Sequence, residues 1–319
     1  MLFRVVRAFL CASILALPAL AAAAAYPEKA IRLLIPFPPG GGTDILARSL
    51  QDKLERALGQ TVVIDNRGGG GGTLGCTVAA RAAPDGYTLL FTSASYSFAP
   101  GLYKDLAYDA VKDFIPITNF AQAPLVLAAH PSMPVMNVKE LLALAKKRPG
   151  EIHYASAGRG SNIFMTTELF KYMAKVNLTH VPYKGGGPAA IGLISGEVQV
   201  GFSGILTAIP FMKSGRMRGI AVSTKQRSPA LPDVPSVDES GVPGYDKASW
   251  FALFAPAAVP KPVIAFVYGA VAKVLKHPDT VKRLAAEGAV VVGNPPEEFG
   301  PFVHSEIAEW TKLIKEMKL

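Results

Sequence analysis

The hydrophobic positions of this chain follow two alternating patterns. Short runs of β-branched and aliphatic residues, typical of strands, are followed by stretches in which apolar residues recur every three or four positions, typical of amphipathic helices. The predicted strands span residues 31–35, 61–65, 87–92, 125–129, 152–156, 178–182, 198–203, 218–223 and 289–292. The predicted helices begin near Thr43, Thr73, Val138, Ser161, Pro188, Lys261 and Pro296. The alternation indicates an α/β fold.

Two segments interrupt the alternation and are typical of connections between domains. Gln122-Ala123-Pro124 precedes an apolar strand, and residues 229–245 are rich in proline and glycine. If the chain crosses at both places, residues 26–124 and 250–319 form one domain and residues 125–249 form the other. We therefore predict two α/β domains with a ligand cleft between them.

The first 25 residues differ from the rest of the chain. Arg4 and Arg7 precede an apolar core at residues 8–20, and three alanines at 23–25 precede Tyr26. This is the pattern of a cleavable secretory signal peptide, whose apolar core is too short to span a bilayer. We therefore expect a soluble mature protein that begins near Tyr26 and resides in the periplasm.

Charge and cysteine content narrow the range of functions. The chain carries 33 Lys and Arg against 24 Asp and Glu, a formal net charge of +9. These basic residues are spread along the chain without interleaved aromatic residues, which argues against nucleic acid and fits attraction of small anions. Cys76 is the single cysteine after the signal peptide, so no internal disulfide is expected, and we predict that it is a small buried residue.

Two junctions between a predicted strand and a predicted helix contain glycine turns. The first is Pro36-Phe37-Pro38-Pro39-Gly40-Gly41-Gly42-Thr43-Asp44, and the second is Ala157-Gly158-Arg159-Gly160-Ser161-Asn162. Such a turn directs backbone N–H groups and the positive end of the helix dipole at one point, which favours an anion. Because the two turns belong to different predicted domains, they would clamp a carboxylate or phosphate if they faced each other. The alternative interpretation is that both are only tight connections.

Other chemical motifs are weak. Gly70-Gly71-Gly72-Thr73-Leu74-Gly75 matches G-x-G-x-x-G, but a run of glycines matches it almost automatically. Gly201-Phe202-Ser203-Gly204 falls short of a nucleophile elbow because Ile205 stands where glycine is required. The histidines are far apart and no carboxylate-rich loop occurs, so we expect no metal site. Hydroxyl groups at predicted strand ends, at Ser93, Ser95 and Ser203, are candidates to bind a small polar ligand.

A series of short motifs follows in order along the mature chain. They are Tyr26-Pro27, Ile31-Arg32-Leu33, Pro36-Phe37-Pro38-Pro39-Gly40-Gly41, Asp44, Ala47-Arg48, Val63-Ile64-Asp65-Asn66-Arg67, Pro84-Asp85-Gly86-Tyr87-Thr88-Leu89, Gly158 with Ser161, His180-Val181-Pro182-Tyr183-Lys184-Gly185, Lys213-Ser214-Gly215, Ala221-Val222-Ser223, Pro243-Gly244-Tyr245, Trp250-Phe251 and Ala255-Pro256. Together they resemble the Bug family, the extracytoplasmic solute receptors of tripartite tricarboxylate transporters.

The resemblance implies a type II periplasmic binding fold whose two domains close around a small organic anion. It implies binding without catalysis, no cofactor, a monomer, and docking of the closed form on membrane permease subunits. The implied carboxylate-binding positions are Phe37, Gly40, Gly41, Gly42, Thr43, Asp44, Ala157, Gly158, Ser161 and Asn162, with further contacts at Ser93, Ser95 and Ser203. Asp44 is expected to orient its turn or a water, because like charges repel.

Two departures from the family pattern affect these expectations. Gly68 replaces the proline that usually follows Asn-Arg, so a looser glycine loop is expected. Ser203 stands near the position where amino-acid-binding relatives often carry an aspartate. We therefore expect a ligand without an amine, such as a dicarboxylate or an aromatic carboxylate. A solute sensor for a signalling partner and an exported hydrolase using Ser203 or Ser161 as nucleophile stay open as alternatives.

Overall fold

The computed structural model describes residues 26–319 of the chain, and the predicted signal peptide lies outside these residues. Its strands are β1 (Ile31–Ile35), β2 (Val62–Asn66), β3 (Thr88–Ser93), β4 (Phe114–Ala129), β5 (His153–Ser156), β6 (Thr179–Pro182), β7 (Val200–Gly204), β8 (Arg218–Val222), β9 (Ala248–Pro256) and β10 (Val290–Val291). Its helices are α3 (Gly42–Leu58), η1 (Gly70–Gly72), α4 (Thr73–Ala80), α5 (Ser95–Leu102), α6 (Val138–Lys147), α7 (Asn162–Ala174), α8 (Gly186–Ile194), α9 (Ile205–Lys213), α10 (Lys261–Lys276), α11 (Pro278–Ala286) and α12 (Pro296–Met317).

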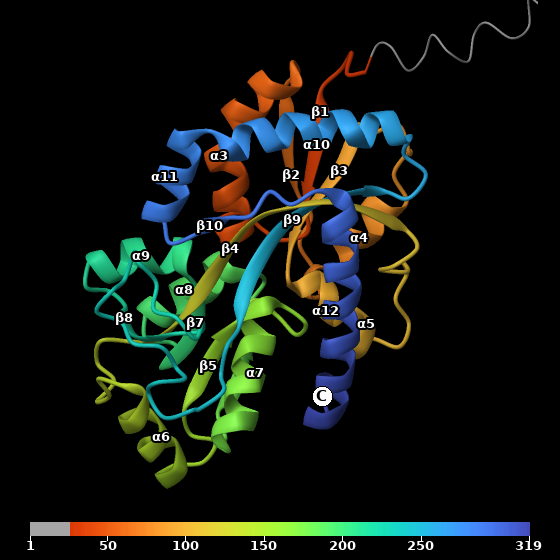
Figure 1. Cartoon of the computed structure of the whole chain (residues 1–319). Coiled ribbons are helices and arrows are strands. Elements are labelled where there is room, and N and C mark those ends of the chain that lie inside the picture. The colour runs from red at the N-terminus through yellow and green to blue at the C-terminus, as the bar shows by residue number, and fades with distance from the viewer. Residues whose placement is uncertain (1–25) are drawn as a thin grey trace, which may run out of the picture.

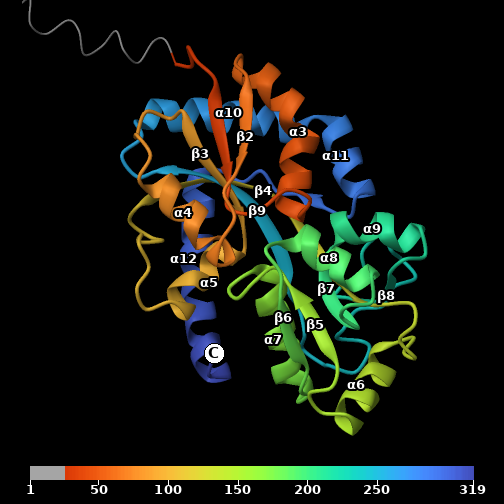
Figure 2. The same ribbon diagram turned by 180° about the vertical axis from the view of Figure 1, so that it is seen from behind.

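The strands form two lobes that share the long strand β4 (Figure 1). In one lobe β1 pairs in parallel with β2 and β3, and β9 runs antiparallel between β3 and β4. In the other lobe β5 pairs in parallel with β6 and β7, and β4 pairs antiparallel with β7 and β8. Helices pack around both lobes, as the view from behind shows (Figure 2). The predicted α/β fold with two domains is therefore confirmed.

Strand β4 passes from one lobe to the other without a loop. Its partner is β9 up to the pair Pro124–Ala248, and from Leu125 onward its partners are β7 and β8. The predicted connection between domains at 122–124 therefore lies inside a strand, at the point where β4 changes its partners. Pro124 is tolerated there because it stands at the last β4–β9 pair, where a missing N–H disrupts the ladder least.

The sequence patterns missed several elements. Strand β9, ASWFALFAP, is apolar throughout from Trp250 onward and therefore shows no alternation. The first half of β4 contains prolines and buried polar residues, which hide its strand character. Helix α9 follows Gly204 without a side-chain cap, so its start carries no polar signal. Helices α5 and α11 were also not predicted.

The predicted apolar stripes lie in the core. In α12, Phe299, Val303 and Trp310 are buried, and the Trp310 ring packs edge-on against Phe98 of α5 at 4.6 Å between ring centroids. Cys76 is 2% exposed, and burial raises the pKa of its thiol to about 12, so the prediction of a small buried residue is confirmed. Across residues 26–319, no helix combines the length and apolar character that a membrane span requires.

Candidate functional site

Four helices begin at the wall of one cavity. Helix α3 starts after Gly41, α8 after Gly185 and α9 after Gly204, each without a side-chain cap. Helix α7 starts after Ser161, whose Oγ accepts a hydrogen bond from the Phe164 backbone N–H at 3.2 Å. The first N–H groups of a helix have no partner within the helix. Four helix starts at one cavity therefore supply a set of neutral donors and dipoles suited to an anion.

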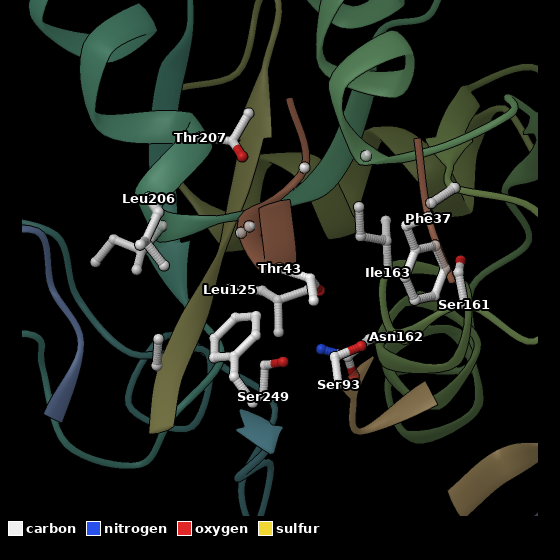
Figure 3. A pocket seen from close by; sticks show the side chains of 18 of the residues that line it. Phe37, Thr43, Ser93, Leu125, Ser161, Asn162, Ile163, Leu206, Thr207 and Ser249 are labelled. Atoms are coloured by element: carbon white, nitrogen blue, oxygen red, sulfur yellow. The ribbon is translucent and has the colours of Figure 1, made fainter. Parts of the chain in front are cut away.

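Polar and apolar side chains both line the cavity (Figure 3). Its lining residues are Phe37, Gly41, Gly42, Thr43, Ser93, Ala123, Pro124, Leu125, Ala157, Ser161, Asn162, Ile163, Gly186, Gly204, Ile205, Leu206, Thr207, Ser249 and Phe251. The space between its walls, including the part open to solvent, is about 600 Å³. None of these described lining residues is ionisable, so a charged ligand is balanced by dipoles and hydrogen bonds rather than by a side-chain charge.

Asp44 holds the first glycine turn from behind the cavity. Its carboxylate is 3% exposed and accepts hydrogen bonds from the Gly40 backbone N–H at 3.0 Å, from Arg48 Nε at 2.9 Å and from Asn66 Nδ2 at 3.1 Å. Asn66 also donates to the Phe37 carbonyl at 2.9 Å, which ties the turn to the end of β2. The carboxylate is thus fully engaged in fixing the turn, and Asp44 is not among the lining residues.

This arrangement predicts the effect of Asp44→Asn. The variant loses the charge-assisted bonds to Arg48 and Gly40, so the free energy of unfolding falls by about 1–3 kcal/mol and ligand affinity falls with it. Chemical denaturation and ligand titration measure the two effects. Asp105→Asn is the control, because Asp105 is exposed and lies outside the cavity lining. An Asp44→Asn protein with unchanged affinity and stability would show that the turn needs no such support.

The structure brings most of the predicted site residues together. Phe37, Gly41, Gly42, Thr43, Ser93, Ala157, Ser161 and Asn162 line the cavity. Five predicted residues, Gly40, Asp44, Ser95, Gly158 and Ser203, lie outside its lining. Ser95 Oγ is 3.1 Å from Ser93 Oγ, and the Gly158 carbonyl accepts from Ser161 Oγ at 2.6 Å. Ser203 is 2% exposed, and its Oγ has no hydrogen-bond partner among the described residues.

Several lining residues were not predicted from the sequence. Residues 204–207 at the start of α9 form one wall, and Ser249 and Phe251 of β9 form another. A signal for the α9 wall was present, since Gly204 follows a predicted strand, but without a polar cap the glycine did not indicate a helix start. The β9 residues become visible only once that strand is placed beside β3 and β4.

The two lobes touch each other outside the cavity lining as well. Tyr103 Oη of one lobe donates a hydrogen bond to the Arg159 carbonyl of the other at 2.9 Å. A Cβ added to Gly71 would lie 2.1 Å from that same carbonyl oxygen, and a Cβ added to Gly185 would lie 2.5 Å from Pro38 Cγ. The glycines at 71 and 185 therefore permit close contact between the lobes. The glycine run that resembled a dinucleotide motif takes part in this contact.

Comparisons with known proteins identify relatives over nearly the whole chain. Residues 46–319 match the family described as "Tripartite tricarboxylate transporter family receptor". Protein BugT of Bordetella pertussis is 35% identical over 293 residues, covering 91% of this chain and 90% of that protein. The structure of periplasmic binding protein BugD is 36% identical with a TM-score of 0.89, covering 92% of this chain and 99% of that one.

Two further solved structures are named with a bound compound. Rpa4515 of R. palustris with adipate is 35% identical, with a TM-score of 0.89 over 92% of this chain and 98% of that one. MatC from Rhodopseudomonas palustris with bound malate is 33% identical, with a TM-score of 0.87 over 91% of this chain and 100% of that one. Each of these proteins superposes over both lobes, since the match covers about nine-tenths of the whole chain.

Proposed function

This chain belongs to the tripartite tricarboxylate transporter receptor family, whose members are periplasmic solute-binding receptors rather than enzymes, and we propose that it captures a small organic carboxylate by closure of its two domains. The observation that carries the proposal is the convergence of four helix N-termini on a cavity whose described lining has no ionisable side chain. Each helix terminus contributes about 0.3–1 kcal/mol toward binding an anion at an exposed site, and up to about 2 kcal/mol where partly buried.

The lining also favours a particular class of carboxylate. An amine would need a carboxylate partner, and none lines the described cavity. Phe37, Leu125, Ile163 and Phe251 supply apolar contact for a hydrocarbon or aromatic body. The ligand is therefore a dicarboxylate or an aromatic carboxylate. The relatives solved with adipate and malate support this class, since both compounds are dicarboxylates without an amine.

We place the domain boundaries where β4 changes partners. Domain 1 comprises residues 26–124 and 250–319, and domain 2 comprises residues 125–249, because β4 leaves β9 after Pro124 and joins β7 at Leu125.

The lining residues of both glycine turns contact the ligand, together with the start of α9. Gly40, Asp44, Ser95 and Gly158 support these contacts from behind. The exported monomer then presents its closed form, in the periplasm, to the permease subunits of a tripartite tricarboxylate transporter.

A binding screen tests the ligand class. Thermal-shift measurements of the mature protein against adipate, malate, benzoate and their neutral amides should show stabilisation by one or more acids and none by the matched amides. Titration calorimetry of the best acid then gives its affinity. Stabilisation by a neutral sugar or an amide, with no response to any acid, would contradict the proposal.

A further inference from the structure

A hydrogen-bonded pair, the buried Ser156 and the half-buried His180, lies directly behind the second glycine turn. Ser156 Oγ, at the end of β5, is 2.6 Å from His180 Nε2 of β6. The two strands are parallel neighbours, and His180 pairs with Tyr154, two residues before Ser156. Ser156 is fully buried, and its Oγ also accepts a hydrogen bond from the Gly158 backbone N–H at 3.1 Å. Neither side chain lines the cavity described above.

The contacts of Ser156 favour one direction for its hydrogen bond with His180. Its Oγ accepts from Gly158, and among the described residues His180 Nε2 is the one acceptor within reach of its hydroxyl hydrogen. Neutral His180 with an unprotonated Nε2 completes this arrangement. A protonated imidazole would donate at Nε2 instead, which leaves the buried Ser156 hydroxyl hydrogen without an acceptor.

The same chain of contacts continues to the cavity. The Gly158 carbonyl accepts from the Ser161 backbone N–H at 3.1 Å and from Ser161 Oγ at 2.6 Å. Ser161 Oγ in turn accepts from Phe164 N–H and caps α7, whose first residues line the cavity. His180, Ser156, Gly158 and Ser161 therefore form one connected network that ends at the proposed carboxylate site.

The surroundings of His180 disfavour its charged form. On β5 the Tyr154 ring stacks on the imidazole at 5.0 Å between centroids, and on α7 the Phe164 ring packs at 4.9 Å. The charged groups near it are Glu168 and Lys171, both on α7; they form an ion pair at 2.7 Å, and Glu168 also accepts from the Tyr154 hydroxyl. Burial, reinforced by Lys171 and opposed by Glu168, lowers the pKa of His180.

We propose that neutral His180 is a positioning residue, which holds the Gly158–Asn162 turn through Ser156 in the geometry that binds the ligand carboxylate. The inference rests on the proposed function for its effect on binding. Loss of the neutral imidazole loosens the turn and weakens binding. The affinity for the carboxylate therefore has its full value when the pH is above the pKa of His180, and it falls as the pH drops through that pKa.

Calorimetry with the best carboxylate from the screen, over about pH 5 to 8 where histidine titrates, tests the proposal. His180→Phe keeps a ring but removes the acceptor, so affinity at neutral pH should fall by about three- to tenfold, the factor expected for one hydrogen bond. His180→Gln can still accept from Ser156, so it should restore most of the affinity and flatten the pH profile. The matched control is His153→Gln, because His153 contacts Gln199 rather than the turn, and it should retain the wild-type profile.

An NMR titration of the unliganded protein separates this inference from the proposed function. The imidazole of His180 and the amides of Gly158 and Ser161 should shift with one shared midpoint, and the amide shifts should vanish in His180→Gln. Amides that do not follow His180, or a His180→Phe protein with wild-type affinity, would overturn the inference. Failure of the wild-type protein to bind any carboxylate, with the shared midpoint intact, would overturn only the proposed function.

Discussion

Replacing Gly71 with alanine should abolish most ligand binding while leaving the protein folded. The added Cβ would lie 2.1 Å from the Arg159 carbonyl oxygen, so the two lobes cannot approach as closely as they do in this structure. The neighbouring atoms are backbone and have little freedom to move. If the clash adds about 2.7 kcal/mol to the closed form, affinity falls about 100-fold. Calorimetry with the best carboxylate measures the loss.

A second glycine separates this clash from ordinary backbone strain. Gly71 has a φ of 66°, which an alanine adopts only at a cost of about 1–2 kcal/mol. Gly59 has a similar φ of 73° at the end of α3, but a Cβ there meets no atom within 4 Å. Gly59→Ala should therefore lose comparable stability and keep its affinity. Equal affinities for the two variants would show that closure at Gly71 is not required for binding.

Asn162→Asp should eliminate carboxylate binding without harming stability. Asn162 is the first residue of α7, and its side chain lines the cavity (Figure 3). The substitution keeps the shape of the side chain and adds a negative charge beside the ligand, at a cost of about 4 kcal/mol for two charges about 4 Å apart in a partly buried site. Affinity should fall by at least about 100-fold. The same charge favours the helix N-terminus, so the melting temperature should hold or rise.

The control for this charge change lies just beyond the other end of the same helix. Asn177 is exposed and lies outside the cavity lining, so Asn177→Asp changes the net charge equally. Its affinity should match that of the wild-type protein. If the Asn162→Asp and Asn177→Asp proteins bind the acid with equal affinity, the ligand carboxylate lies away from α7.

Local sequence signals were sufficient to predict an element where residues typical of a helix start and a helix end stand directly at its two ends. Helix α3 combines a glycine turn at its start, a stripe of buried leucines, and Gly59 at its end, so its bounds could be predicted closely. The two glycine turns were recognisable for the same reason, because a strand, a turn and a helix follow one another directly in the chain. These signals were enough to locate both turns that line the cavity.

The remaining walls depend on tertiary contacts that no local pattern encodes. Strand β9 is buried on both faces, so its sequence has no period that distinguishes it from a core helix. Its Ser249 and Phe251 reach the cavity only because β9 pairs with β3 and β4. The contact of Gly71 with Arg159 likewise joins distant parts of the chain, and it explains a glycine run that had resembled a nucleotide-binding motif.

The most direct test of the carboxylate site is a crystal structure of the mature protein with the best acid from the screen. We expect a carboxylate group against the first backbone N–H groups of α3 and α7, with the body of the ligand near Leu125 and Phe251. A ligand whose carboxylate pairs instead with a lysine or arginine side chain, or that binds outside this cavity, would contradict this expectation.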